Sequence, residues 1–189
     1  QTPEEAVAGR SVPIRVRIHN NKAGHDFPTG PLDIIQAWVE VVAVDGSGNE
    51  IFHTGGVDSR HFVDTGTFMF KAEPIDRYGN LIDRHNVWEM VGVRFKRSLY
   101  PGASDVAPFE LPCPGVASDV VEPASRDRQV VVALPEEAAG TIRVTAKLQY
   151  RKFDQFLLDY AFGAPSGLTA PLTTLSGSSA TILVRGARA

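Results

Sequence analysis

Residues 141–150 alternate strictly between apolar and polar side chains. The even positions, from Ile142 to Tyr150, are apolar, and the odd positions, from Arg143 to Gln149, are polar. A period of two is that of a β-strand with one face on a core and the other in water. The segment therefore predicts a strand in a layered β protein.

Further strand-like segments occur along the chain, with turn signals between them. Segment 12–18 is apolar at every second position, and Asp45-Gly-Ser-Gly-Asn49 supplies the residues of a hairpin turn. The predicted strands are 12–18, 34–44, 50–53, 67–71, 88–96 and 129–134, with 181–185 as a last strand or a docking tail. Segments 20–31, 73–83, 100–123 and 135–140 are predicted as loops or turns because of their Gly, Pro, Asn and Asp residues.

One short helix is predicted over 153–162, where Phe153, Phe156, Leu157 and Tyr160 recur at helical spacing. Many short strands with a single helix predict an all-β fold. We expect an antiparallel β-sandwich, immunoglobulin-like or jelly-roll-like, with long loops and one short helix. The sandwich domain is expected to span 1–162. Segment 163–189 is expected to be a Gly/Ser/Pro-rich C-terminal arm that could contribute a last strand.

The charge balance argues against a nucleic-acid partner. The chain has 19 Lys and Arg against 22 Asp and Glu, a net charge of -3, whereas nucleic-acid binding needs a basic surface. Arg94 and Lys96 alternate with Val93 and Phe95, as on the solvated face of a strand. No apolar run approaches the ~20 residues of a transmembrane segment, and residues 1–10 lack a signal-peptide profile.

Cys113 is the single cysteine, which excludes several kinds of chemistry. One cysteine cannot form an internal disulfide or a cysteine-rich zinc site. Covalent haem attachment needs C-x-x-C-H, which the sequence does not contain. The motifs G-x-S-x-G, H-E-x-x-H and G-x-G-x-x-G and the P-loop are missing as well. We therefore expect no covalent cofactor and no catalytic residues.

His25 lies in a loop braced by Pro28 and Pro31, within Gly24-His-Asp-Phe-Pro-Thr-Gly30. Imidazole is the usual axial ligand of haem iron and a common ligand of copper or zinc, and Asp26 could orient it. The simpler alternative is that His25 forms hydrogen bonds within its own loop.

Asp76, Asn80 and Asp83 place hard oxygen ligands around a glycine turn, loosely like a calcium loop. Their spacing does not match an EF-hand, and a hydrogen-bonded Asx turn is the simpler alternative. His85 and Trp88 follow directly, so this loop and the His25 loop could meet at one end of the sandwich.

Four segments together carry a family resemblance. They are Gly24-His-Asp-Phe-Pro-Thr-Gly30, the run from Trp38 to Asn49, the run from Phe70 to Trp88, and Leu148-Gln-Tyr-Arg-Lys-Phe153. They resemble the β-sandwich domain found beside haem-binding segments in periplasmic multihaem c-type cytochromes, and the likeness extends over about 12–160. The chain departs from that family because it has no C-x-x-C-H, so it cannot conduct electrons through covalent haems of its own.

The resemblance implies a non-catalytic accessory or scaffolding subunit of a periplasmic electron-transfer complex, respiratory or photosynthetic. Such a subunit would pack against a multihaem cytochrome or a related membrane complex. His25 would be an axial ligand to the partner's haem, and the partner-facing residues would be His25, Phe27, Pro28, His85 and Trp88. The expected location is periplasmic or extracellular in a bacterium, with a signal peptide removed.

Two other classes of function remain open. One is a calcium- or copper-binding module, which would carry stoichiometric metal when purified without chelators. The other is a metal-dependent enzyme, in which His25 and His85 would be needed for activity.

Overall fold

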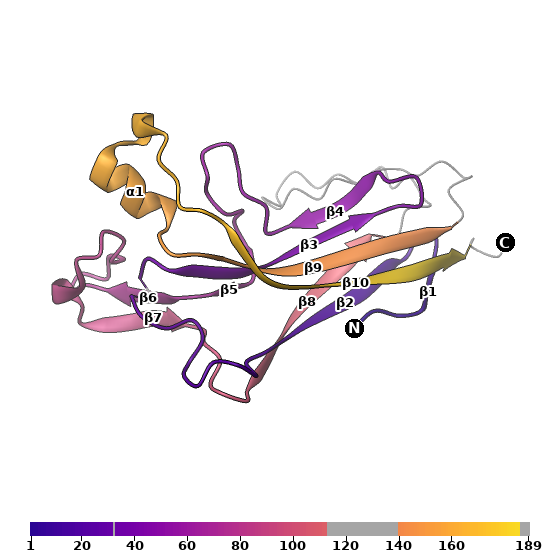
Figure 1. The fold of residues 1–189 in the computed structure, drawn as a ribbon, viewed down its shortest axis with the longest axis horizontal. Helices are drawn as coiled ribbons and strands as arrows, with labels where there is room; N and C mark the ends of the chain where they lie inside the picture. Colours follow the sequence, from indigo (N-terminus) through magenta and orange to yellow (C-terminus); the bar gives the residue numbers. More distant parts are fainter. Residues whose placement is uncertain (32, 113–139, 186–189) are drawn as a thin grey trace.

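The computed structural model describes residues 1–31, 33–112 and 140–185, which form a mostly β protein (Figure 1). Its strands are β1 (Glu5–Val7), β2 (Ser11–His19), β3 (Gln36–Val44), β4 (Glu50–Thr54), β5 (Met69–Phe70), β6 (Ala72–Ile75), β7 (Gly92–Lys96), β8 (Ser104–Pro112), β9 (Thr141–Arg151) and β10 (Thr173–Arg185). Its helices are α1 (Gln155–Phe162) and the short 3₁₀ helices η1 (Val87–Glu89) and η2 (Ala164–Ser166). The strand predicted at 129–134 and Cys113 lie outside the described residues. No helix in the described ranges is long and apolar enough to cross a membrane.

A large sheet runs along the molecule with the strand order β1-β10-β9-β3-β4. β5 also pairs with β3, next to Ala37 and Trp38, whereas β4 pairs with the C-terminal part of β3. All these pairs are antiparallel except β1 with β10, which is parallel. Two-stranded sheets, β2-β8 and β6-β7, complete the β structure of the described residues.

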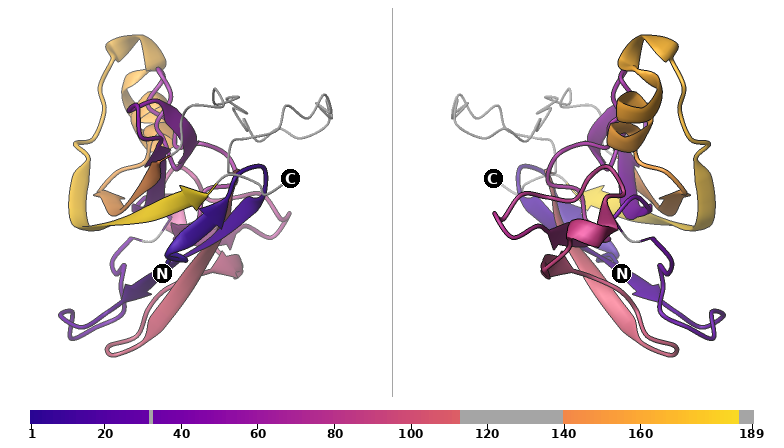
Figure 2. Two further views of the ribbon diagram at one scale, coloured as in Figure 1. Left: turned by 90° about the vertical axis from the view of Figure 1, so that its right-hand side faces the viewer. Right: turned by 90° about the vertical axis from the view of Figure 1, so that its left-hand side faces the viewer.

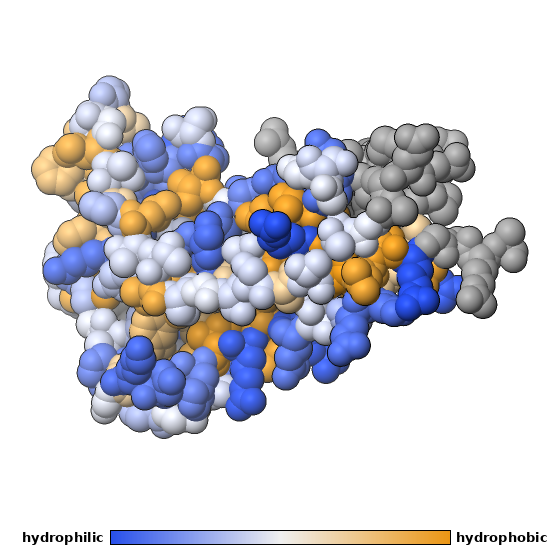
Figure 3. Space-filling model, turned by 45° about the vertical axis from the view of Figure 1, so that its right-hand side comes forward, coloured by the Kyte–Doolittle hydropathy of each residue, from blue (hydrophilic) through white to orange (hydrophobic). Residues whose placement is uncertain are grey.

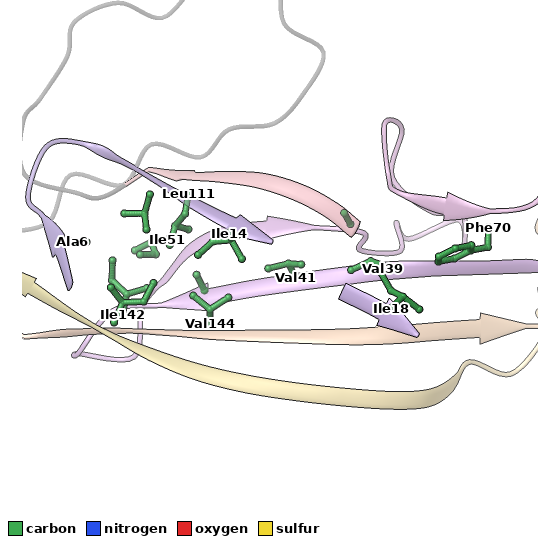
Figure 4. Packing of buried hydrophobic residues seen from close by; sticks show 14 of the residues in the cluster. Ala6, Ile14, Ile18, Val39, Val41, Ile51, Phe70, Leu111, Ile142 and Val144 are labelled. Atoms are coloured by element: carbon green, nitrogen blue, oxygen red, sulfur yellow. The ribbon is translucent and has the colours of Figure 1, made fainter. Parts of the chain in front are cut away.

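The hydrophobic core lies between the β2-β8 sheet and the large sheet (Figure 4). Ile14 of β2 and Leu111 of β8 face this core, as do Ile142 and Val144 of β9. Ile142 lies directly opposite Ile182 in β10, and neither side chain has any exposed surface. The alternation in 141–150 thus places its apolar face as predicted, and the all-β class with one short helix is confirmed.

The outer face of the large sheet buries the side chain of Trp38, which is 0 % exposed. Its indole Nε1 donates a hydrogen bond of 2.8 Å to the carbonyl oxygen of Gly55. Gly55 has φ +76°, and a Cβ there would lie 2.5 Å from the carbonyl oxygen of Val39. Only glycine fits this position, which brings the 55–67 segment onto the sheet.

Polar side chains next to Trp38 are also buried on this outer face. Arg151 is 1 % exposed, and its guanidinium donates to Gln36 Oε1 at 2.6 Å and to the carbonyl oxygen of His61 at 2.5 Å. Gln149 was expected to face solvent, but it is buried and its Nε2 donates to Glu40 Oε2 at 2.7 Å. The expectation is wrong because a loop covers this face, which alternation alone cannot reveal.

Two predicted loops contain strands. The segment 73–83 begins inside β6, and the segment 100–123 contains the nine residues of β8. These segments were predicted as loops because prolines such as Pro74 and Pro108 usually break strands. β6 and β8 belong to two-stranded sheets, in which a proline can lie where its missing N–H is not needed for pairing.

Two predicted boundaries also move. Trp88 was expected at the start of a strand over 88–96, but it lies in η1, and β7 begins at Gly92. The last strand was expected from Thr181, but β10 begins at Thr173. Thr173 to Ser179 are all exposed, so no hydrophobic alternation marks this half of the strand in the sequence.

The predicted helix is confirmed as α1. It begins after Asp154, whose side chain accepts a hydrogen bond of 2.8 Å from the backbone N–H of Leu157. This is the usual N-cap arrangement, and the helix ends at Gly163 with φ +79°. α1 lies above the β6-β7 sheet at the end of the molecule remote from both termini (Figure 1).

Candidate functional site

The loop that carries His25 is fixed by a buried side chain. Asn20 donates from Nδ2 to the carbonyl oxygens of His25 and Leu99, each at 3.0 Å. The His25 side chain itself is exposed, and its Nδ1 lies 2.9 Å from the carbonyl oxygen of Asp26. When Nδ1 donates to this carbonyl, Nε2 carries the lone pair that could bind a metal.

Phe27 and Pro28 attach this loop to the body of the chain. The Phe27 ring packs edge-to-face on Phe70, with 6.0 Å between centroids, and Pro28 is buried after a cis peptide bond. The backbone of Phe27 forms an antiparallel bridge with Leu99. Of these two predicted partner-facing residues, Phe27 therefore packs on the chain's own core and Pro28 is buried, while the His25 side chain is exposed.

His85 contacts Asp33, which lies between the His25 loop and β3. His85 has φ +59°, and its Nδ1 lies 2.9 Å from Asp33 Oδ2. The Asp33 side chain is 3 % exposed, so this contact is buried on the aspartate side. In the His25 loop itself, the Asp26 carboxylate lies 3.9 Å from Lys96 Nζ of β7.

The turn at Asp76 has the same hydrogen bonds as the hairpin turn at Asp45. In both, Oδ1 accepts from the backbone N–H groups two and four residues later, and Oδ2 accepts from the side chain of the Asn at the fifth position. These bonds, led by that from the Asn80 side chain, lower the pKa of Asp76. Both carboxylate oxygens of Asp76 thus accept hydrogen bonds from its own turn.

Asp83, the third residue of the predicted calcium loop, lies beside Arg84, with 3.5 Å between Oδ1 and Nε. In the part of the chain that the structure describes, no three His, Cys, Asp or Glu side chains are grouped as metal ligands. Calcium at Asp76, Asn80 and Asp83 stays a prediction.

Several exposed apolar side chains belong to α1, to η1 and to the residues that flank β6 and β7. These elements lie at the end that faces the viewer in the right view of Figure 2. Trp88 is 79 % exposed and Val91 is 66 % exposed. Arg84 joins the loop before η1 to α1, because its guanidinium lies 4.9 Å from the Tyr160 ring centre. We call this surface the apolar end, and it comprises Tyr78, Leu81, Trp88, Val91, Phe156 and Tyr160. Apolar residues of α1 stand out at the upper left of Figure 3.

A cleft of about 200 Å³ opens beside the apolar end. Leu81 and Phe156 form part of its wall, so the cleft is continuous with that surface. The carboxylates of Asp33, Asp83 and Asp154 also line it. The cleft is therefore lined by both apolar and acidic side chains, and Lys71 is also part of its wall.

Burial, together with the charges of Asp33 and Asp83, raises the pKa of Asp154 to about 6. The backbone N–H of Leu157 and the guanidinium of Arg151 act in the opposite direction without cancelling this effect. The side chain can therefore take up a proton in mildly acidic solution. The α1 N-cap thus titrates within a range in which ordinary aspartates stay ionised.

The sequence pointed to Trp88 as a partner-facing residue but not to Phe156 and Tyr160, which are also exposed at this end of the molecule. Both aromatic residues were assigned to a helix stripe packed on the domain, yet both are exposed, and Gln155 is the buried residue of α1. A signal was available, since the helix QFLLDYAF is apolar around most of its circumference. Asp33 and Arg151 gave no comparable signal, because only the fold brings their partners together.

The fold of this chain occurs in a known haem protein. A solved structure of a penta-haem cytochrome c552 from Thermochromatium tepidum matches 96 % of this chain with a TM-score of 0.58 and 17 % sequence identity. The fold is similar to part of that cytochrome. This chain corresponds to 38 % of the length of the cytochrome chain. Neither a scan against models of protein families nor a search of curated proteins finds a match.

Proposed function

We propose that this chain is a non-catalytic accessory domain that packs, through its apolar end, against a haem-bearing polypeptide of a periplasmic electron-transfer complex. The partner would be a multihaem c-type cytochrome or a related subunit of a membrane-associated complex. The fold similarity to part of a penta-haem cytochrome supports this context. The chain itself has no C-x-x-C-H, so in this proposal the partner supplies the haem.

The observation that carries the proposal is the exposure of the apolar end. Several large exposed apolar side chains at one end of a protein often mark an interaction site. Trp88, Tyr160 and Phe156 are aromatic, and aromatic residues contribute strongly to binding at the centres of interfaces. Their exposure does not serve the core, which lies between the two sheets further along the molecule.

The charges around the apolar end suit a haem-bearing partner. Haem combines a flat apolar macrocycle with anionic propionates. The guanidinium groups of Arg84 and Arg77 lie over the rings of Tyr160 and Tyr78, at 4.9 and 4.7 Å from the ring centres. Exposed aromatic rings with adjacent guanidinium groups could contact both parts of a partner's haem, or the protein surface around it.

His25 is the candidate axial ligand in this proposal. Its ring is exposed on a fixed loop, and the Asp26 carbonyl oxygen lies near Nδ1, which leaves Nε2 for iron. The loop borders β7 through Asp26 and Lys96, next to the sheet that carries part of the apolar end.

The test is purification of the native protein from its source in mild detergent at moderate ionic strength, followed by size exclusion with detection of haem absorbance. We expect the protein to elute with a c-type haem protein. A monodisperse monomer that co-elutes with no haem protein would contradict the proposal.

Two matched variants assign the contact to the apolar end. Val91→Asp places a charge on this surface, and Val106→Asp makes the same change on β8, where the valine is 42 % exposed. We expect the first variant to lose the haem protein and the second to retain it. Equal retention by both variants would place the contact elsewhere.

A further inference from the structure

A different surface, the outer edge of β10, lacks a neighbouring strand over most of its length. β10 pairs with β9 from Thr173 to Leu183 along one side. On its other side β1 reaches only Leu183 to Arg185. Within the described ranges, segment 173–182 therefore has one open edge, and Figure 1 shows β10 at the margin of the large sheet with β1 beside its C-terminal end.

The register identifies which backbone groups point out of this edge. The N–H of Val184 donates to Gly140 on the β9 side, whereas the N–H of Leu183 donates to Glu4 on the open side. Neighbouring residues of an antiparallel strand direct their N–H and C=O groups to opposite sides. Because the register with β9 is continuous from Ser176 to Leu183, the groups that point outward belong to Thr181, Ser179 and Gly177.

This edge lacks the features that usually prevent strand addition. Natural edge strands carry charged residues, prolines or bulges that discourage pairing with another chain. β8 contains Asp105 and Pro108, and β7 contains Arg94 and Lys96. Segment 173–182, Thr-Thr-Leu-Ser-Gly-Ser-Ser-Ala-Thr-Ile, contains no charged residue and no proline, and its one bulge lies between Thr174 and Ser176.

We propose that β10 of a second copy of this chain pairs with this edge, antiparallel and across a two-fold axis near Ser179. In this register Gly177 lies opposite Thr181 of the second copy, and Ser179 lies opposite its own equivalent. Two identical strands meet most easily when they carry no charge, because a two-fold axis places like charges near each other. Small side chains at Gly177, Ser178 and Ser179 also let the two backbones approach.

The pairing would join the two large sheets into one continuous sheet. Its extent is limited at Leu183, where Glu4 already accepts the outward N–H. The contact is therefore short and consists mainly of backbone hydrogen bonds, so we expect a reversible dimer that forms as the concentration rises. It leaves the apolar end uncovered and does not depend on the function proposed for that end.

The test is sedimentation equilibrium of the full chain over a range of concentrations, with two variants of Ser179. We expect the mass of the wild type to rise from 20.5 kDa toward twice that value. Ser179→Pro removes one outward N–H without removing a bond to β9 and should hold the protein at the monomer mass. Ser179→Ala keeps the N–H and should behave as the wild type.

Amide hydrogen exchange of the wild type gives a second reading if the proline variant fails to fold. Exchange at Gly177, Ser179 and Thr181 should slow as concentration rises, while exchange at Ser178, which is paired to β9, should stay unchanged. A monomer mass at every concentration would overturn the proposal. That holds even if a different protein binds the edge, because the proposal names a second copy of this chain. A dimer whose three outward amides exchange at a concentration-independent rate would overturn it as well.

Discussion

The two tryptophans of this chain lie in regions of opposite character. Trp38 is 0 % exposed on the large sheet, where its indole N–H is bonded to Gly55. Trp88 is 79 % exposed in η1, at the apolar end. Both are large apolar residues, but only Trp38 contributes its surface to folding. The contrast separates the part of the sequence that stabilises this chain from the part that is available to a partner.

The backbone structure around the two tryptophans differs as well. Around Trp38 the strands β3 and β9 pair over the full length of β3, and the 55–67 segment is held on them by Arg151. Around Trp88 the chain forms one short 3₁₀ turn and a two-stranded sheet. The regular strand pairing around Trp38 stabilises the fold, whereas the short turns around Trp88 hold side chains exposed beside the β6-β7 sheet.

The largest expected effect is the loss of stability on truncating the buried tryptophan. Trp38→Ala should lower the free energy of unfolding by about 3–5 kcal/mol, because it leaves a cavity and orphans the Gly55 carbonyl. Urea denaturation followed by circular dichroism measures the change. A loss below about 1 kcal/mol would mean that the outer face of the sheet is not packed as described.

Asp154 couples the α1 N-cap to pH. The folded protein holds this proton up to pH about 6, against a usual pKa of 3.8, so the free energy of unfolding falls as pH rises between these values and is level above them. The decrease is roughly 2–3 kcal/mol. Asp154→Asn should remove this component while keeping an acceptor for the Leu157 N–H. Urea titrations from pH about 4 to 7 compare the two proteins, and identical slopes would contradict the shift.

Glycine substitutions compare the two regions directly. Gly55 and Gly79 both have positive φ, but a Cβ at Gly55 would meet Val39, whereas nothing lies within 4 Å of a Cβ at Gly79. Gly55→Ala should therefore lower the free energy of unfolding by about 1–3 kcal/mol more than Gly79→Ala. The Gly79 variant measures only the backbone cost of a positive φ, because its Cβ meets no neighbour. Thermal unfolding of both variants measures the difference. Equal losses of stability in the two variants would show that Gly55 does not lie close against the Val39 carbonyl oxygen.

The fold was predictable wherever hydrophobic periodicity records burial. The alternation around Ile142 predicted β9, and the paired turn residues after Val44 predicted the β3-β4 hairpin. The spacing around Phe156 predicted α1, although its aromatic residues are exposed. β8 and the first half of β10 were missed, because Pro108 and the exposed Ser and Thr residues give no apolar signal. Pairing partners, rather than their own composition, hold these segments as strands.

The candidate site was predictable only in part. Trp88 and His85 were placed at one end together with the His25 loop, but the contact that His85 makes is with Asp33, fifty-two positions away and outside that loop. The pKa of Asp154 is raised by burial and, to a smaller extent, by Asp33 and Asp83, which are distant in sequence. Local patterns describe turns such as Asp76 to Asn80, whereas contacts between loops exist only in the folded chain.

The smallest expected effect on stability belongs to the exposed tryptophan. Trp88→Ala should change the free energy of unfolding by no more than about 0.5 kcal/mol, because the side chain is already in water. The same urea titrations used for Trp38→Ala give this value. A loss comparable with that of Trp38→Ala would show that η1 supports the fold, and the contrast between the two regions would fail.

Oxidative footprinting of the native assembly tests the central claim most directly, because it works whatever the partner is. Side-chain oxidation is compared between the protein in its native assembly and the isolated chain. We expect Trp88 and Tyr160 to be protected in the assembly, while Tyr100, which is also exposed but lies outside the apolar end, is oxidised equally in both. Equal oxidation of Trp88 in the two samples would contradict the assignment of the apolar end as a docking surface.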